Sequence, residues 1–374
     1  MKIGTISLNI NAPDFNYGAI LHSWAFQRYL KMLDVTTSTE IIDYTMPILE
    51  GQNLHYPFLY DLKKKRPKRC IRELISWRVY QTRYKKFQSF IKRELQTSKI
   101  KYVQKSLEMA TLDYDCIICE SDVIWSPGFS GGHFDRSFFL ALKSMSQMKR
   151  IAYAPSMANG DLTEAQKAEL KELLTYPQYI SCRESYEKCI LEKYTDKEVT
   201  YVMDPVFLLD REEYDRICPP PNKKKYLFLY LPVDDNLSLR KSATDYANSH
   251  NLDIIEINTY LKNYKRDNII CIGDAGIEEF LSAIKYADVV FTNSFHAICF
   301  SVIFNVQFYA FSRAYAGKVK DICEVLGLSK RYFPDDHFEE QPPIDYAKVN
   351  MVKDRLVEKS RMWLQSALEK IDNK

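Results

Sequence analysis

The sequence predicts an α/β protein with two Rossmann-like domains, each a parallel sheet whose strands are joined by helical crossovers. The length of 374 residues fits two domains of roughly 100–200 residues each. Short β-rich runs alternate with amphipathic helical segments along the chain, which is typical of parallel sheets. A proline-rich stretch at 204–225 separates two such alternating blocks.

The first block opens with a complete crossover. A strand is predicted at 2–9, a loop at 11–18 and a helix at 19–33. The helix is indicated by apolar residues with helical spacing, namely Phe26, Tyr29, Leu30 and Leu33. A strand at 39–44 then returns the chain to the sheet.

The middle of the first block contains an insertion before the alternation resumes. Residues 47–67 are predicted to be irregular and end in a basic run, and a long basic helix is expected at 71–95. The later strands are predicted at 116–119, 150–154 and 179–182. Thr163 and Gln166 form a capping box that begins a helix at 164–176.

The second block repeats the alternation after the proline-rich stretch, which holds Pro205, Pro219, Pro220 and Pro221. Strands are predicted at 226–231, 253–258, 268–272, 288–292 and 307–311. A helix is indicated by Ile277, Phe280, Leu281 and Ile284. A final helix at 347–371 is expected to pack back across the junction. The expected division is therefore 1–205, 206–345 and a terminal helix at 346–374.

Composition argues against several classes of protein. A net charge of +3 does not suggest a nucleic-acid binder. Nine scattered cysteines suggest reduced thiols rather than a disulfide framework. The N-terminus reads as a strand rather than a signal peptide, and no apolar run is long enough to span a bilayer. We expect a cytoplasmic location, or a peripheral one at the inner face of the membrane.

No familiar metal or nucleotide motif is present. Cys116 and Cys119 have CxxC spacing but lie in a predicted strand, where residues three apart point to opposite faces. The sequence lacks HExxH, Walker, GxSxG and GxGxxG patterns, and its six histidines have no ligand spacing. We therefore expect neither a bound metal nor a resident cofactor.

Ligands of open α/β sheets bind beyond the carboxyl ends of the strands, which directs attention to the segment 292–297. Ser294 is a good N-cap, and the start of a helix attracts anions. His296 would lie in the first turn, where an imidazole can bind phosphate or pass a proton. The alternative is a core or capping histidine.

Three cations follow other predicted strands. Arg183 comes just after the strand at 179–182 and could bind a carboxylate or phosphate, although it could equally pair with Glu184 or Glu187. Arg313 and Lys318 follow the strand at 307–311 and would suit an anionic ligand. The alternative for these two is an ordinary solvated loop.

Two further segments could bind a sugar. Ser121 and Trp125 lie in a polar turn after the strand at 116–119, with a core position as the alternative for Trp125. Asn16 and Tyr17 precede the first helix and could contact a phosphate or a sugar hydroxyl. The basic run at 63–69 is most simply a solvated face, with anionic lipid headgroups as the other option.

Taken in order, these segments resemble the polysaccharide pyruvyltransferase family over about residues 3 to 318. The matching stretches are 16–22, 41–44, 114–118, Ser121-Asp122, Trp125, 151–154, Arg183-Glu184, Asp204-Pro205, 279–281, 292–296 and Phe300-Ser301. The sequence departs from the family pattern GSDQVWNP at Glu120, Val123, Ile124 and Ser126, and Ala297 stands where glycine is common.

The resemblance implies a GT-B-like fold with a central cleft. It also implies phosphoenolpyruvate as the donor and a sugar with a ketal-linked pyruvate as the product. The sugar would belong to a cell-surface polysaccharide or to its free or lipid-linked precursor. Arg183 and His296 match the functional arginine and histidine of the family, and Arg313 or Lys318 matches a downstream basic residue. Domain closure would assemble the site. A nucleotide-sugar glycosyltransferase and a non-catalytic sugar-binding or scaffold protein remain alternatives.

Overall fold

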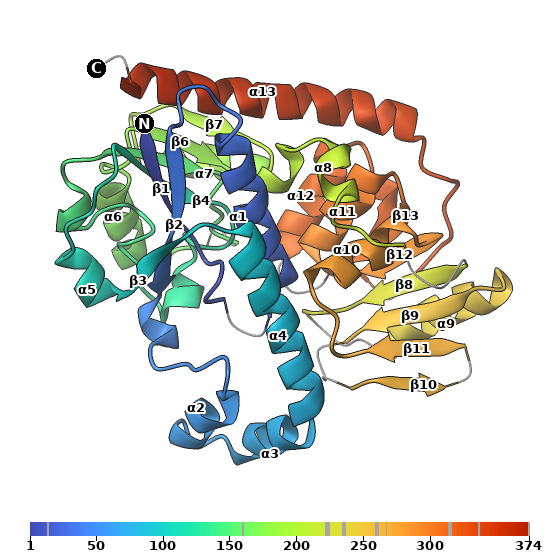
Figure 1. The fold of residues 1–374 in the computed structure, drawn as a ribbon. Coiled ribbons are helices and arrows are strands. Elements are labelled where there is room, and N and C mark those ends of the chain that lie inside the picture. Colours follow the sequence, from blue (N-terminus) through green and yellow to red (C-terminus); the bar gives the residue numbers. More distant parts are fainter. Residues whose placement is uncertain are drawn as a thin grey trace. The chain divides into compact units, whose positions relative to one another are not determined.

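The computed structural model describes residues 1–12, 15–158, 161–220, 225–233, 237–258, 262–266, 268–312, 316–335 and 337–372. The chain forms two compact units, each discontinuous in sequence. Unit 1 comprises Met1–Glu50, Glu94–Leu209 and Asn350–Lys374, and unit 2 comprises Gly51–Arg93 and Asp210–Val349. The segment 51–93 thus belongs to the same unit as residues 210–349, and the segment from residue 350 onward belongs to the same unit as residues 1–50 and 94–209. The predicted α/β fold with two Rossmann-like parts is confirmed (Figure 1).

Unit 1 is built on a seven-stranded sheet whose pairings are all parallel, in the order β3-β2-β1-β4-β5-β6-β7. Its strands are β1 (Lys2–Ile6), β2 (Ser38–Thr45), β3 (Thr97–Val103), β4 (Cys116–Glu120), β5 (Lys149–Tyr153), β6 (Tyr179–Cys182) and β7 (Val199–Tyr201). Its helices are α1 (Tyr17–Leu30), α5 (Gln104–Glu108), α6 (Glu164–Leu173), α7 (Ser185–Leu191) and most of α13 (Tyr346–Asp372).

Unit 2 repeats this plan with the strand order β10-β11-β9-β8-β12-β13-β14, in which only β10 is antiparallel to its neighbour. Its strands are β8 (Tyr226–Tyr230), β9 (Asp253–Ile257), β10 (Tyr264–Arg266), β11 (Ile269–Ile272), β12 (Val289–Thr292), β13 (Gln307–Phe311) and β14 (Tyr332–Phe333). Its helices are α2 (Pro57–Lys63), α3 (Pro67–Ile75), α4 (Trp77–Glu94), α8 (Arg211–Asp215), α9 (Leu237–Ser249), α10 (Ile277–Lys285), α11 (Phe295–Phe304) and α12 (Ala316–Val325).

Each sheet therefore contains the Rossmann order 3-2-1-4-5-6. In such sheets the direction of winding reverses between the first and fourth strands, and ligands bind at the carboxyl ends on either side of that reversal. The reversal lies between β1 and β4 in unit 1, and between β8 and β12 in unit 2. These two edges are where functional residues are expected.

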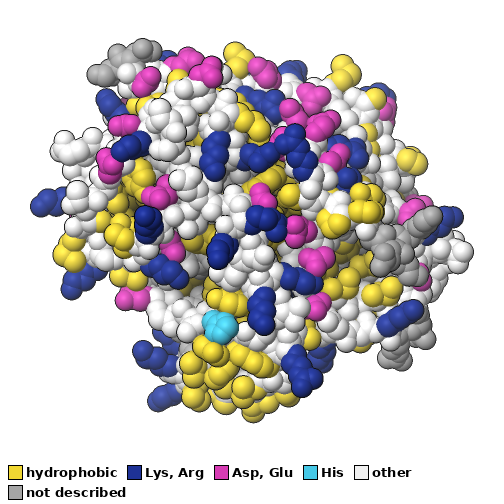
Figure 2. Space-filling view, viewed as in Figure 1, with side chains coloured by type: hydrophobic (Ala, Val, Ile, Leu, Met, Phe, Trp, Pro, Cys, Tyr) yellow, Lys and Arg dark blue, Asp and Glu magenta, His cyan; other side chains and the backbone are white. Residues whose placement is uncertain are grey.

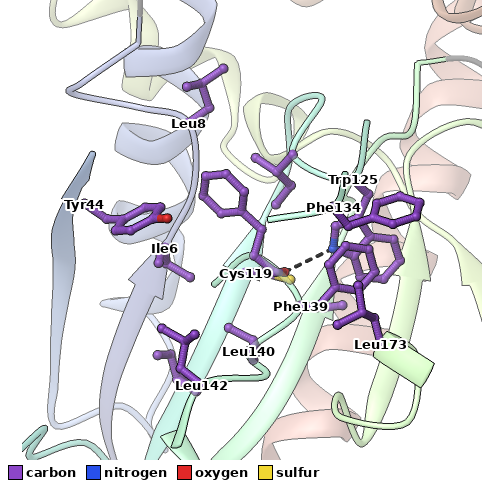
Figure 3. Close-up of a cluster of buried hydrophobic side chains, with 14 of the residues drawn as sticks. Ile6, Leu8, Tyr44, Cys119, Trp125, Phe134, Phe139, Leu140, Leu142 and Leu173 are labelled. Atoms are coloured by element: carbon purple, nitrogen blue, oxygen red, sulfur yellow. Dashed lines mark hydrogen bonds between the residues drawn. The ribbon is translucent and has the colours of Figure 1, made fainter. Parts of the chain in front are cut away.

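The core of unit 1 packs aromatic and aliphatic side chains against the sheet (Figure 3). Trp125 is fully buried, stacks on Phe139 at 4.5 Å between ring centroids, and donates its indole N–H to the Phe138 carbonyl at 3.0 Å. The corresponding core of unit 2 includes Leu227, Ile254, Phe291 and Tyr309. The central strands are buried on both faces, which explains their continuous apolar sequences.

The expected long helix at 71–95 was wrong, because the segment forms two helices. Ser76 separates α3 from α4, and its carbonyl accepts the first α4 hydrogen bond from the Tyr80 N–H. The irregular segment expected at 47–67 contains α2. Pro57 and Pro67 each occupy the first position of a helix, where the missing N–H costs nothing.

Helix α13 closes unit 1 from the far end of the chain. The Met203 N–H donates to the Ser360 hydroxyl at 2.9 Å, and Arg361 donates to the Leu208 carbonyl. Trp363 also contacts Tyr153. Among the helices that the structure describes, none is both long and apolar enough to traverse a lipid bilayer.

Candidate active site

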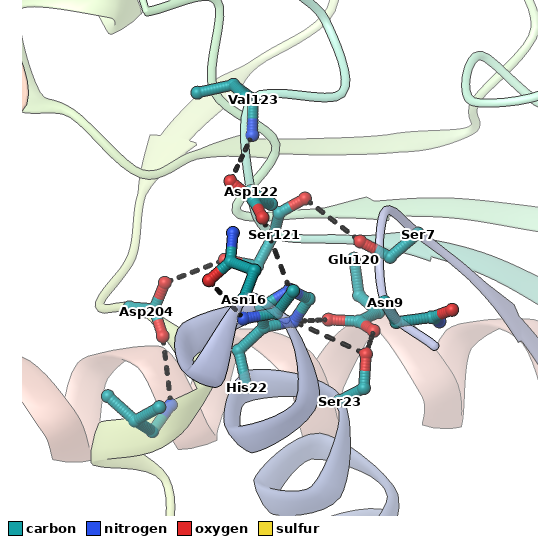
Figure 4. A network of polar contacts seen from close by, with 12 residues as sticks. Ser7, Asn9, Asn16, His22, Ser23, Glu120, Ser121, Asp122, Val123 and Asp204 are labelled. Atoms are coloured by element: carbon teal, nitrogen blue, oxygen red, sulfur yellow. Dashed lines mark hydrogen bonds and ion pairs between the residues drawn. The ribbon is translucent and has the colours of Figure 1, made fainter. Parts of the chain in front are cut away.

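The polar cluster of unit 1 lies where β1 and β4 end (Figure 4). Ser121 and Asp122 directly follow β4 and have positive φ angles of 49° and 57°. Left-handed backbone is costly for residues other than glycine and is concentrated at functional sites. The Asp122 carboxylate accepts the Val123 N–H, and the Ser7 hydroxyl donates to the Ser121 carbonyl. These contacts hold the turn in its unusual conformation.

A buried histidine of α1 contacts the residues on either side of Ser121 in this turn. His22 comes from α1, and its Nδ1 lies 2.7 Å from the Glu120 carboxylate. The Ser23 hydroxyl donates to the other Glu120 oxygen, and Asp122 lies 3.8 Å from His22 Nε2. Glu120 thus has two partners on α1, which gives a physical reason for a buried carboxylate at this position.

The electrostatics of this pair favour the protonated histidine. Burial opposes the charged form of His22, but the Glu120 carboxylate, followed by Asp122 and Asp204, outweighs it and raises the pKa of His22 to about 9. Burial also raises the pKa of Glu120 above its usual value, although His22 and Ser23 oppose that change. At neutral pH a charged imidazole therefore lies within the core of unit 1.

This pair should make stability fall as the pH rises. The folded-state pKa of His22 is above the unfolded value of 6.5, so its contribution is complete below pH 6.5 and is lost by about pH 9. Each pKa unit corresponds to about 1.4 kcal/mol, so the free energy of unfolding should drop by about 2–3 kcal/mol over this window. Urea titrations of the wild type and His22→Gln would measure it. An equal decline in both proteins would contradict the assignment.

Arg183 joins the same cluster from the end of β6. Its Nε donates to Glu184 at 2.9 Å, and its Nη1 donates to Asp204 at 3.2 Å and to the Ser121 hydroxyl at 3.4 Å. The residue is only 3% exposed. Ser121 in turn donates to Asp204 at 2.7 Å. Arg183 is therefore held by carboxylates inside unit 1 and fixes the turn after β4.

Carboxylates outnumber cations in this cluster. Glu187 of α7 is fully buried and accepts the Met157 N–H at 2.7 Å. Burial, reinforced by the neighbouring Glu184, raises the pKa of Glu187 well above its usual value. Acidic side chains thus outnumber cations at the carboxyl edge of unit 1, which suits hydroxyl groups better than phosphate.

The other unit 1 residues predicted from the sequence occupy different places, with Asn16 beside the polar cluster in Figure 4 and Tyr17 and Trp125 buried. Asn16 is exposed and caps α1 by accepting the Ala19 N–H at 3.2 Å. Tyr17, the first residue of α1, is buried. Trp125 lies in the core described above. Ser121 and Arg183 are in direct contact through the hydrogen bond described above.

The polar cluster of unit 2 lies at the end of β12. The Thr292 hydroxyl donates to the Tyr230 carbonyl at 2.6 Å and accepts the Ser294 N–H at 3.0 Å. Asn293 accepts the Val233 N–H at 3.3 Å. These contacts join the ends of β8 and β12, the two strands that flank the reversal of the unit 2 sheet.

Helix α11 begins at this edge and is buried along its whole length. Ser294 is its N-cap, as predicted, and accepts the Ala297 N–H at 3.4 Å. His296 lies in the first turn, is 8% exposed, and is the one ionisable side chain other than Cys299 in a helix that is otherwise almost entirely apolar. A polar ring at the start of such a helix is well placed to meet an anion that binds the helix end.

Helix α12 brings Lys318 to the same edge of unit 2. It follows β13, the parallel neighbour of β12, and Lys318 lies half-buried in its first turn. Ser294, His296 and Lys318 therefore come from adjacent strand ends. Arg313, the other cation predicted here, lies outside the described residues.

Sequence reasoning missed His22, Glu120 and Arg83. Arg83 of α4 is buried and donates to the Asn258 carbonyl at 3.3 Å, beyond the end of β9. A signal for it was available, because it lies on the same stripe as the buried α4 residues Tyr80, Phe87 and Phe90. Within the described residues, no group of three His, Cys, Asp or Glu side chains could hold a metal ion.

Solved structures similar to this chain support the fold. The UDP-GlcNAc 2-epimerase from Methanocaldococcus jannaschii has a TM-score of 0.52 at 13% identity, with 96% of this chain and 94% of that chain covered. A putative UDP-N-acetylglucosamine 2-epimerase from Listeria monocytogenes has a TM-score of 0.50 at 8% identity, with coverages of 98% and 90%. At this identity the likeness shows a GT-B-like fold and nothing finer.

Sequence comparison is more specific. No curated protein matches this chain. A family model described as polysaccharide pyruvyl transferase matches residues 16–315, a range that includes Ser121, Arg183 and His296. The resemblance inferred from the motifs is thereby confirmed, and the chain belongs to the polysaccharide pyruvyl transferase family.

Proposed function

We propose that this protein transfers pyruvate from phosphoenolpyruvate to a sugar of a cell-surface polysaccharide or its precursor, forming a cyclic ketal and releasing phosphate. Membership of the polysaccharide pyruvyl transferase family supports the transferase class. The observation that carries the donor assignment is His296 in the first turn of the buried helix α11, at the reversal of the unit 2 sheet.

Phosphoenolpyruvate carries a phosphate and a carboxylate and therefore needs donors and cations. The first turn of α11 offers backbone N–H groups that have no partner within the helix, together with the positive end of its dipole. Lys318 adds a cation from the next strand end, and Arg313 is a second cation of the same segment of sequence. We assign donor binding to this edge of unit 2.

The reaction requires two proton movements, and His296 is the group proposed to handle them. Protonation of the methylene carbon of phosphoenolpyruvate makes the adjacent carbon electrophilic, and a sugar hydroxyl attacks it. Loss of phosphate and attack by a second hydroxyl close the ketal. One hydroxyl proton replaces the proton delivered to carbon, and the other leaves with phosphate. An imidazole can transfer protons in both directions near neutral pH.

We propose that the sugar binds at the carboxyl edge of unit 1, near Asn16, Ser121 and Asp122. The excess of acidic side chains in that cluster supports hydroxyl binding. Arg183 acts there as a positioning residue, because its described contacts are to Glu184, Asp204 and Ser121. No metal or resident cofactor enters the proposal.

Thermal stability in the presence of candidate donors tests this assignment. A ligand bound only by the folded state stabilises it by about 2.7 kcal/mol at a hundred times its Kd. Phosphoenolpyruvate should raise the melting temperature of the wild type, and Lys318→Gln should reduce that rise. Lys320→Gln, which alters a more exposed lysine of the same helix, is the matched control and should behave as wild type. A rise with UDP-GlcNAc and none with phosphoenolpyruvate would replace pyruvyl transfer by glycosyl transfer.

A further inference from the structure

The helical hairpin formed by α2 and α3 exposes an unusual amount of apolar surface. Five large aliphatic side chains within 17 residues are between 50% and 79% exposed, namely Leu59, Leu62, Ile71, Leu74 and Ile75. Figure 2 shows hydrophobic side chains gathered at the lower end of the molecule, where Figure 1 draws α2 and α3. Soluble proteins rarely leave such contiguous patches uncovered, so this one indicates a binding surface.

The sequence of the hairpin explains why both helices are amphipathic. Leu59 and Leu62 are three residues apart on α2, while Ile71, Leu74 and Ile75 have i, i+3, i+4 spacing on α3. The one acidic side chain of α2, Asp61, is buried and lies 3.6 Å from Arg66. The carboxylate is thus withdrawn from the surface, while the aliphatic groups project outward.

Positive charge is concentrated around the same patch. Residues 57–78 contain eight Lys or Arg against two Asp or Glu, a net charge of +6, whereas the whole chain has +3. The remainder of the chain is therefore net negative. Lys63, Lys64, Lys65 and Lys68 are all exposed. Aliphatic side chains bordered by lysines characterise helices that lie in the interface of an anionic bilayer.

The base of the hairpin is braced rather than loosely attached. Trp77 stacks between Tyr56 and Tyr80, with ring centroids 5.7 and 6.1 Å away. The Tyr80 hydroxyl donates to the Leu54 carbonyl at 2.7 Å. Farther along α4, Lys86 pairs with Glu279 at 2.6 Å and Arg93 with Glu278 at 2.8 Å. These contacts fix the hairpin to the rest of unit 2.

We propose that the α2–α3 hairpin docks the protein on an anionic membrane surface, with its aliphatic face entering the headgroup region and its lysines contacting acidic lipids. The inference is independent of the proposed reaction, because it concerns a surface distinct from both polar clusters. It fits an enzyme that works beside a bilayer without spanning it.

Vesicle co-sedimentation of the full-length protein tests this proposal without any substrate. We expect binding to vesicles of phosphatidylcholine with one third phosphatidylglycerol, little binding to phosphatidylcholine alone, and weakening by salt. The triple variant Lys63→Gln/Lys64→Gln/Lys68→Gln should lower the partition coefficient about a hundredfold. Lys99→Gln/Lys101→Gln/Lys105→Gln removes the same charge from exposed lysines of unit 1 and should bind as wild type.

The apolar face requires its own comparison. Leu62→Ser/Ile71→Ser/Ile75→Ser should also lower partitioning about a hundredfold, because each side chain loses its transfer into the interface. Met351→Ser/Met362→Ser alters residues that are 75% and 61% exposed on α13, and it should have no effect. Undiminished binding of the serine variant, or equal loss in the lysine control, would overturn the proposal. The proposal would also be overturned if the wild type did not bind vesicles but formed dimers, and the serine variant were a monomer. The apolar face would then bind a second copy of the chain.

Discussion

Replacing Arg183 by methionine is expected to lower the free energy of unfolding by about 3–5 kcal/mol, the usual cost of removing one partner of a buried ion pair. The substitution keeps an unbranched side chain of similar length but leaves Glu184 and Asp204 without the guanidinium that they share. It also removes a donor from the Ser121 hydroxyl, and with it part of the support for the turn after β4. Urea denaturation followed by circular dichroism would measure the loss.

Two comparisons make the Arg183 result interpretable. Arg136 pairs with Glu172 through two hydrogen bonds of 3.1 and 3.0 Å at the surface of the same unit, so Arg136→Met should cost under about 1 kcal/mol. Adding Asp204→Asn to Arg183→Met should recover part of the loss, because one uncompensated carboxylate disappears. An Arg183→Met protein of wild-type stability that no longer binds phosphoenolpyruvate would instead make Arg183 a donor-binding residue.

Replacing His296 by glutamine is expected to reduce turnover by a factor of about 10²–10⁴ while the fold is retained. Glutamine preserves size and hydrogen bonding but cannot transfer a proton near neutral pH. Ser294 continues to cap α11, so the melting temperature should change little. The measurement is phosphate release from phosphoenolpyruvate with a panel of sugar acceptors, analysed as separate kcat and KM values.

The division between kcat and KM identifies what His296 does. Loss confined to kcat supports proton transfer, whereas a raised KM with unchanged kcat would mean that the ring only binds the donor. His133→Gln is a suitable control, because the His133 side chain is 84% exposed in unit 1 and should leave both constants unaltered. A His296→Gln enzyme with wild-type values of both constants would remove this residue from the mechanism.

The central strands of the two sheets could be predicted from the sequence, whereas the outermost strands could not. Strands β1, β4, β6, β8 and β13 are short apolar runs because both of their faces are buried, and that composition is visible without a structure. The strands left unpredicted, β3, β7, β10 and β14, occupy the edges of the two sheets. β3 has the sequence TSKIKYV and exposes three successive residues, so no apolar run marks it.

Some features of the candidate site could likewise be predicted from local sequence, whereas others depend on contacts between distant residues. The N-cap at Ser294 and the position of His296 follow from local sequence. A serine directly after an apolar strand marks the residue at which the next helix begins. The partners of Arg183 do not, since Asp204 and Ser121 are 21 and 62 residues away. His22 and Glu120 are 98 residues apart, and only folding brings them together. Pair contacts at such separations leave no periodic trace in the sequence.

Charge alone was not enough to predict the exposed apolar surface of the α2–α3 hairpin. A basic run usually means a solvated face, and the run at 63–69 gives no other indication by itself. What changes the interpretation is exposure of Ile71, Leu74 and Ile75, which amphipathic spacing would ordinarily bury. Whether an apolar stripe faces a core or the solvent depends on what packs against it.

The interleaved order of the two units has a consequence for biosynthesis. The chain passes from one unit to the other after residues 50, 93, 209 and 349, so unit 1 is assembled from segments that are made both before and after most of unit 2. Met203 and Leu208 must wait for Ser360 and Arg361 before their hydrogen bonds can form. During synthesis, unit 1 therefore begins to form before unit 2 but is completed only when residues 350–372 have been made. A truncation before residue 350 would therefore leave unit 2 nearly whole and remove the last segment of unit 1.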